Sequence, residues 1–107
     1  MKIKQIKKRD GSIVSFDSSR IEKAILGACN ELEYEMEPTQ LSVIVDTVVG
    51  VLESRFPMMI PSVEDVQDVV EMSLADKGLF TVAKAYIIYR YERAKERSVG
   101  QLVGATA

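Results

Sequence analysis

Apolar residues recur every three or four positions in four separate stretches of this 107-residue chain, and this periodicity limits the fold more than any other feature. Pro38 suits the first turn of a helix, and Gly78 suits the position just after one. Ser19 and Glu22 form a capping box, in which each side chain binds an unpaired backbone N–H, and Ser62 is a further expected cap. The predicted helices span residues 19–32, 38–55, 63–77 and 81–97.

The first 16 residues predict a β-hairpin. Residues 3–8 and 13–16 are the expected strands, and Asp10-Gly11 lies between them. This dipeptide favours a type I′ turn, in which both central residues take positive φ. Residues 56–61 are expected to be a loop or a short extended piece. The predicted fold class is therefore α+β, an N-terminal β-hairpin, with or without a short third strand, packed on a four-helix bundle.

Length and hydrophobicity indicate one domain, over residues 1–97, followed by a tail or linker over 98–107. Hydrophobic residues make up 47% of the chain, which is enough for a core. No apolar run approaches the roughly 20 residues that a membrane span needs. The first residues lack the apolar segment of a signal peptide. The expected location is the cytoplasm, with no membrane partner.

The residues that are missing exclude several kinds of chemistry. The chain has no histidine and one cysteine, Cys29, so it offers no Ser-His-Asp triad, no internal disulfide and no ordinary zinc site. It also lacks the GxxxxGK[ST], GxGxxG and HExxH motifs. We expect a domain without catalytic residues and without protein metal ligands.

The charges are unevenly distributed along the chain. Residues 1–20 and 77–107 each carry six Lys or Arg and two acidic residues, whereas 21–76 carry two basic and twelve acidic residues. If the fold brings the two basic ends together, a positive site forms on an otherwise acidic protein. Such a site suits a compact polyanion such as a triphosphate, and the acidic remainder disfavours a long nucleic acid.

Basic residues beside the predicted turn are the first candidates for an anion site. Lys7, Lys8 and Arg9 are either solvated charge on an exposed turn or a phosphate clamp, because ammonium and forked guanidinium groups both match phosphate oxygens. Arg20 lies beside the start of the first helix, where unpaired N–H groups already favour anions.

A second candidate surface lies on the fourth helix. Tyr89 and Arg93 are four residues apart and share one face. Two interpretations are open. Tyr89 belongs to the core and Arg93 is solvated, or the two side chains form a surface that stacks on a base and holds phosphate.

The sequence resembles the ATP-cone family in three stretches that occur in the family's order and spacing. Ile6-Lys7-Lys8-Arg9-Asp10-Gly11, Phe16-Asp17 and Arg20-Ile21-Glu22-Lys23-Ala24-Ile25 resemble the opening of the family's domain. Residues 63–71 and 82–90 resemble its third and last helices. The similarity covers residues 3–97.

This resemblance implies an allosteric domain that binds ATP as activator and dATP as inhibitor, and that controls the overall activity of a ribonucleotide reductase by a change of oligomeric state. Mg²⁺ is expected to accompany the triphosphate. The implied partners are the catalytic or radical-generating subunit of the reductase and further copies of the same chain. The alternatives are a nucleotide-sensing domain of a transcriptional repressor, which would need a zinc ribbon not seen in this sequence, and a helical adaptor that binds only protein.

The resemblance also implies roles for individual residues. Lys8, Arg9 and Arg20 would hold phosphates, and Asp17 would recognise the exocyclic amine of adenine. Val14 stands where some members of the family have a glutamate that helps to read adenine. The walls of the adenine site would be Ile6, Ile21, Val63 and Gln67.

The number of nucleotides bound, one or two, stays open. Some relatives have histidine in place of Gln67 or Tyr89. The full set of expected nucleotide-binding residues is Ile6, Lys7, Lys8, Arg9, Val14, Asp17, Arg20, Ile21, Val63, Gln67, Tyr89 and Arg93.

Overall fold

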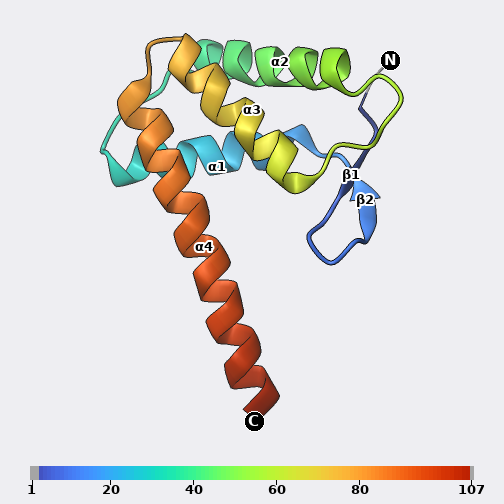
Figure 1. Cartoon of the computed structure of the whole chain (residues 1–107). Coiled ribbons are helices and arrows are strands. Elements are labelled where there is room, and N and C mark those ends of the chain that lie inside the picture. The colour runs from blue at the N-terminus through green and yellow to red at the C-terminus, as the bar shows by residue number, and fades with distance from the viewer. Residues whose placement is uncertain (1–2, 107) are drawn as a thin grey trace.

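The computed structural model describes the backbone of residues 3–106 and the side chains of residues 3–95. Within these residues, an antiparallel two-stranded hairpin precedes four helices, which confirms the predicted α+β class. The hairpin lies at one end of the helical layers, and α4 runs diagonally past them (Figure 1). The elements are β1 (Gln5–Lys7), β2 (Ile13–Ser15), α1 (Ser18–Glu31), α2 (Pro38–Arg55), α3 (Val63–Asp76) and α4 (Phe80–Thr106).

The hairpin turn is not of the predicted type I′. Gly11 has a φ of 90°, but Asp10 does not take positive φ. Lys8 donates its N–H to the carbonyl of Ser12 at 2.8 Å, so the three residues 9–11 form the loop. The Asp10 carboxylate accepts bonds from the N–H and the hydroxyl of Ser12, at 2.9 and 2.6 Å. These two bonds stabilise the longer loop in place of the two-residue turn.

The hairpin is attached to the start of α3. Ile6 lies opposite Val14 in the β1–β2 pair. On the other edge of β1, Lys7 donates its N–H to the carbonyl of Pro61 at 3.0 Å and forms an isolated parallel bridge with Ser62. The segment that was predicted to be a loop or short extended piece therefore adds a single bridge to the sheet, and α3 begins beside the hairpin.

The first helix is capped by Asp17 and not by Ser19 of the predicted capping box. Asp17 has extended backbone (φ −130°, ψ 104°), and its carboxylate accepts from the Ser19 N–H at 3.0 Å and the Ser19 hydroxyl at 2.7 Å. The predicted capping box of Ser19 and Glu22 is therefore wrong, because Ser19 acts as donor to the stronger acceptor upstream. Ser62 does cap α3, in a capping box with Asp65 (2.9 and 3.1 Å).

The last helix is longer than the sequence pattern indicated. Helix α4 continues to Thr106, whereas the prediction ended it at Arg97. Side chains after residue 95 lie outside the described part, so the boundary between a domain over 1–97 and a tail over 98–107 stays a prediction. Among the described residues, no helix combines the length and apolarity needed to cross a membrane.

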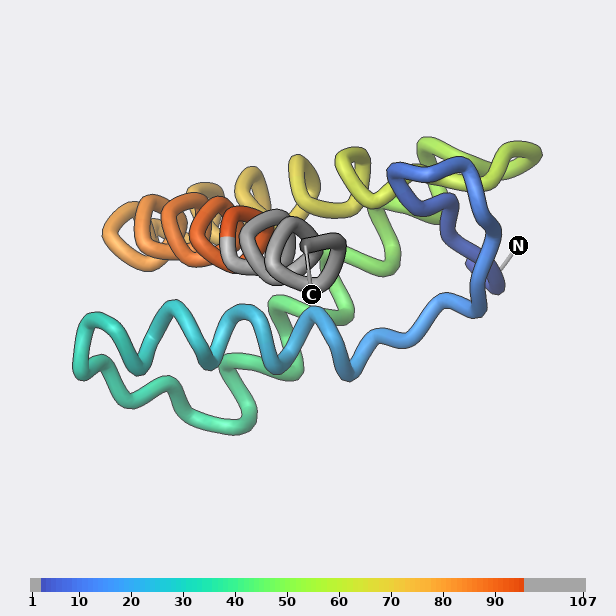
Figure 2. Tube along the Cα trace, turned by 90° about the horizontal axis from the view of Figure 1, so that it is seen from below, coloured from blue at the N-terminus to red at the C-terminus, as the bar shows by residue number. Residues whose placement is uncertain are grey.

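The core is formed by the apolar faces of all four helices. Helix α4 packs against α1 and α3, and α3 packs against α2. Figure 2 shows α4 lying between α1 and α3, with the hairpin beside the start of α3. Leu32, the C-cap residue of α1, is exposed. The most deeply buried apolar side chains include Ile25, Ile44, Val48, Leu52, Val69, Val70 and Leu74.

Candidate functional site

The fold brings residues from the two basic ends of the sequence together, which is the condition that the charge distribution set for a positive site. Arg9 from the hairpin loop and Arg90 and Lys95 from α4 line one open pocket of about 410 Å³. Ile87 and Tyr91 contribute apolar surface to the same pocket. The lining is therefore cationic and partly aromatic, which suits an anionic ligand with a planar group.

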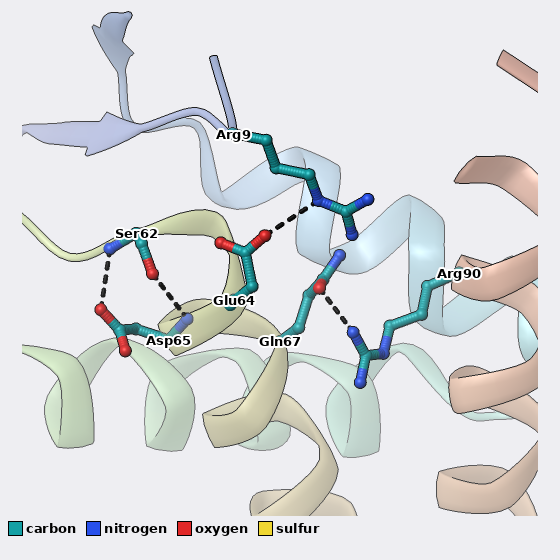
Figure 3. Close-up of polar contacts among 6 residues, drawn as sticks. All are labelled: Arg9, Ser62, Glu64, Asp65, Gln67 and Arg90. Carbon is teal, nitrogen blue, oxygen red and sulfur yellow. Dashed lines mark hydrogen bonds and ion pairs between the residues drawn. The ribbon is translucent and has the colours of Figure 1, made fainter. Parts of the chain in front are cut away.

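The first turn of α3 holds the hairpin arginine. Arg9 Nε donates to Glu64 Oε1 at 2.9 Å, and both side chains are about half exposed (54% and 51%). Figure 3 shows that this bond uses one nitrogen of the guanidinium, while the two terminal nitrogens extend past Glu64. A single bond at Nε leaves the terminal fork of the guanidinium available to a phosphate.

The next two turns of α3 hold an arginine of α4. Arg90 Nη1 donates to Gln67 Oε1 at 2.6 Å, and Nη2 donates to the Glu71 carboxylate. The side chains of Arg90 and Glu71 are only 26% and 23% exposed. Such partly desolvated, charge-assisted bonds are stronger than those at an open surface, so they fix Arg90 against α3.

The nucleotide-binding residues expected from the sequence did not include Glu64, Glu71 or Arg90. The available signal was the spacing of Glu64, Gln67 and Glu71, which places three acceptors on one face of the third helix. That pattern alone is also typical of a solvated helix face. The partners of these acceptors come from the hairpin and from α4, and the sequence does not reveal that convergence.

The apolar residues predicted to contact the base lie on three elements. Ile21 is buried in the first turns of α1, at 6% exposure. Ile6 packs against the core from β1, and Val63, the first residue of α3, is half-buried. The parallel Lys7–Ser62 bridge makes β1, which carries Ile6, a neighbour of the start of α3, which carries Val63. Val14 on β2 is exposed.

The polar residues at the start of α1 form an anionic cap beside a cation. Hydrogen bonds from the hydroxyl and N–H of Ser19 hold the pKa of Asp17 below its ordinary value of 3.8, so this carboxylate is ionised at neutral pH. Both bonds go to Oδ1. Arg20 follows in the first turn and is exposed, as are Lys7 and Lys8 of the hairpin.

The predicted residues of α4 are placed differently from one another. The ring of Tyr89 lies against Gly27 of α1 and is half-buried there, so it belongs to the α1–α4 contact. Arg93, one turn later, is exposed. Neither residue lines the pocket that contains Arg9 and Arg90.

These features define a small α+β ligand-binding domain. Its basic hairpin loop and its basic helix α4 both contact the first turns of α3. Residues 4–95 match the ATP cone domain family, and the chain belongs to that family. The resemblance seen in the sequence is thereby confirmed.

The chain is also similar to parts of several ribonucleotide reductases. It is 38% identical over 100 residues to the vitamin B12-dependent ribonucleoside-diphosphate reductase of Mycobacterium tuberculosis, covering 94% of this chain and 14% of the relative. The enzyme of the same name from Thermoplasma acidophilum is 38% identical over 111 residues (95% and 13%). The ribonucleoside-diphosphate reductase subunit alpha of Chlamydia trachomatis is 33% identical over 101 residues (86% and 10%).

The chain thus spans about one seventh or less of the length of these relatives. Its family and its similarity to reductases identify it as a nucleotide-sensing allosteric domain.

Proposed function

We propose that this chain binds ATP and dATP between the hairpin loop, the start of α1, the first turns of α3 and the facing side of α4. One observation carries the proposal: in an ATP cone domain, Arg9 from the hairpin and Arg90 from α4 both bond to the same face of α3. Groups that are far apart in sequence are thereby held around one cationic pocket.

The triphosphate is proposed to lie against the hairpin loop. The terminal fork of Arg9 and the ammonium groups of Lys7 and Lys8 donate to phosphate oxygens, with Arg20 at the start of α1 as a further cation. Backbone N–H groups at the start of α1 favour negative charge in the same region.

Adenine is proposed to lie deeper, among Ile6, Ile21 and Val63. Asp17 accepts from the exocyclic amine of adenine, because it is an ionised carboxylate whose Oδ2 accepts no hydrogen bond from the described residues. The remaining contacts proposed for the nucleotide come from Val14, Gln67, Tyr89 and Arg93.

Mg²⁺ is proposed to bind together with the triphosphate. This ion is commonly held by one or two carboxylates, water and substrate phosphates, in place of an all-protein cage. The Glu64 carboxylate beside Arg9 is an oxygen donor of the right kind at this position. Within the described residues, no group of three or more His, Cys, Asp or Glu side chains is suited to hold a metal ion.

The domain is further proposed to regulate a ribonucleotide reductase, with ATP as activator and dATP as inhibitor. A binding domain without its own chemistry acts by favouring one conformation or one assembly when it is occupied. The proposed partners are the catalytic or radical-generating subunit and further copies of the chain, and the proposed location is the cytoplasm.

Titration calorimetry of the 107-residue chain with ATP, dATP and GTP, each with Mg²⁺, tests the binding proposal. We expect both adenine nucleotides to bind in the micromolar range, about −7 to −9 kcal/mol, and GTP to bind more weakly. Absence of heat and of thermal protection with ATP and dATP up to millimolar concentration would overturn the proposal.

A further inference from the structure

We propose that Arg90 is a positioning residue that fixes which end of the Gln67 amide faces the nucleotide. This inference rests on the proposed function and adds a specificity element to it. Arg90, which is itself held by Glu71, keeps the amide of Gln67 in one orientation. The site therefore presents a hydrogen-bond donor at this point of α3, and this donor selects a hydrogen-bond acceptor of the ligand.

The orientation of Gln67 follows from the chemistry of its partner. A guanidinium has five N–H donors and no acceptor. Because Arg90 Nη1 lies 2.6 Å from the amide, only the carbonyl oxygen of Gln67 can face it. The NH₂ group must then point away from Arg90.

The NH₂ group of Gln67 points toward the hairpin arginine. Figure 3 shows the amide nitrogen directed at the terminal nitrogens of Arg9, while the amide oxygen is directed at Arg90. Glu64 and Gln67 are three residues apart on one face of α3, and Glu64 holds Arg9 at 2.9 Å. Two donor groups, an amide and a guanidinium fork, therefore face the same space.

Neither donor group has a protein acceptor in the described residues: Gln67 Nε2 and the terminal nitrogens of Arg9 make no hydrogen bond there. Two groups that only donate are complementary to an atom that only accepts. A phosphate oxygen has this character and also carries the charge that Arg9 requires. We therefore place a phosphate oxygen of the nucleotide between Arg9 and Gln67.

Arg90 is suited to this role because it is itself immobilised. Its second terminal nitrogen bonds to Glu71, one turn beyond Gln67, and the ion pair is about three-quarters buried. A planar fork can hold two acceptors on one helix face at once, whereas an ammonium group on a flexible stem cannot fix both directions. Without Arg90, the amide of Gln67 can rotate and present its oxygen, which would repel phosphate.

A double-mutant cycle tests whether Arg90 acts through Gln67. ATP binding is measured by calorimetry for the parent, Arg90→Met, Gln67→Ala and the double variant. We expect each single change to weaken binding about 10-fold, the scale of one hydrogen bond, and the double change to weaken it no more than about 10-fold. Multiplicative losses of about 100-fold would mean that Arg90 contacts the ligand independently, and would overturn the inference.

Lys84→Met is the matched control for lost charge. Lys84 is an exposed cation on the same helix, outside the proposed site. We expect its removal to change ATP affinity by less than about 2-fold, since an exposed charge is screened by solvent. A loss equal to that of Arg90→Met would assign the effect to net charge and overturn the positioning role.

Two further variants keep the test independent of folding. Arg90→Lys keeps the positive charge for Glu71 but loses the fork, so we expect near-parent thermal stability with ATP binding as weak as in Arg90→Met. Gln67→Glu keeps an acceptor for Arg90 and replaces the donor with a second acceptor, so we expect at least about a 10-fold loss. Parent-like affinity in either variant would overturn the inference.

The outcomes separate this inference from the function on which it rests. If the parent chain does not bind ATP, the proposed function fails and this inference fails with it. If the parent binds ATP but the cycle is multiplicative, the binding function stands and the positioning role of Arg90 is wrong.

Discussion

The ring of Tyr89 on α4 lies directly over Gly27 on α1. A methyl group built on the Gly27 Cα would lie 2.5 Å from Tyr89 Cζ and 2.7 Å from its hydroxyl oxygen, far inside contact distance. The absence of a side chain at Gly27 therefore sets how closely the two helices approach, and Tyr89 fills the space that this glycine provides.

We expect Gly27→Ala to destabilise the chain by about 1–2 kcal/mol, although alanine favours helix by about 1 kcal/mol, because the methyl group displaces the Tyr89 ring. The measurement is urea unfolding. Gly50→Ala on α2 is the matched control: a Cβ there meets nothing within 4 Å, so we expect a gain of about 0.5–1 kcal/mol. If Gly27→Ala is as stabilising as the control, the close contact does not exist in solution.

A second prediction concerns the end of α1. Glu33 has a φ of 54°, the left-handed region that favours glycine, and Tyr34 donates its N–H back to the carbonyl of Cys29 at 2.9 Å. The end of α3 has the same arrangement with a glycine, Gly78, at a φ of 77°, and the bond from Leu79 to Leu74 is 3.0 Å. The two helix ends share one motif, with different residues at its strained position.

We therefore expect Glu33→Gly to raise the free energy of unfolding by about 0.5–1 kcal/mol, because the left-handed conformation costs a residue with a Cβ about 1–2 kcal/mol and glycine much less. The reciprocal change, Gly78→Glu, should destabilise by a similar amount. Thermal and urea unfolding measure both. Opposite signs from those expected would show that the α1 terminus takes another conformation in solution.

A third prediction concerns pH. Hydrogen bonds from Ser19 lower the pKa of Asp17 in the folded chain below 3.8. A carboxyl group with a lowered folded-state pKa contributes stability above its unfolded pKa and loses it as the pH falls through the folded value. We expect Asp17→Asn to be less stable than the parent at pH 7, and the gap to close as the pH falls below about 4.

Urea unfolding between pH 7 and pH 2 measures this gap. Asparagine remains a good N-cap, so the variant isolates the charge of the cap from its geometry. In a Ser19→Ala background the gap at pH 7 should be smaller, because the largest cause of the lowered pKa is removed. A gap that does not change with pH would contradict the prediction.

A fourth prediction concerns the hairpin loop. We expect Arg9→Ala, and likewise Lys8→Ala, to weaken ATP binding by about 1.5–3 kcal/mol, the scale of a charge-assisted hydrogen bond. Thermal stability without ligand should hardly change, because the Arg9–Glu64 pair is half exposed and such pairs contribute at most about 1 kcal/mol. Lys77→Ala, at the opposite end of α3, is the control cation. If the Arg9 and Lys8 variants bind ATP as tightly as the parent chain, both residues are solvated charges on an exposed loop and the prediction is wrong.

Much of the fold was predictable because it depends on local signals. Helix α2 has the predicted limits, and α3 starts at its Ser62 cap and ends before Gly78, since caps and terminal glycines act within a few residues. The predicted type of turn at Asp10-Gly11 was wrong, because the hydrogen bonds from Ser12 to the Asp10 carboxylate favour a longer loop.

The site was less predictable, because it is built from tertiary contacts. The charge distribution indicated what would follow if the two basic ends met, but it did not predict that they meet and did not identify their partners. Arg90 meets Gln67 across 23 positions of sequence, and Arg9 meets Glu64 across 55. Nothing local to Glu64 distinguishes an acceptor that orients an arginine from a carboxylate that faces solvent.

The last prediction is that dATP changes the quaternary state of the protein that carries this domain. ATP and dATP differ by one hydroxyl group, which is worth a few kcal/mol only if it is buried against a wall or a partner. We therefore expect dATP to bind at least as tightly as ATP and to shift the mass distribution of the intact parent protein in sedimentation or light scattering, at matched nucleotide concentration. Arg9→Ala in that protein should move the shift to nucleotide concentrations at least about 10-fold higher, because it weakens binding and leaves the rest of the surface unchanged. Equal mass distributions with ATP, dATP and no nucleotide would exclude a change of association as the regulatory mechanism. Regulation would then require a conformational change within one molecule, through the contacts of α3 with the hairpin and α4.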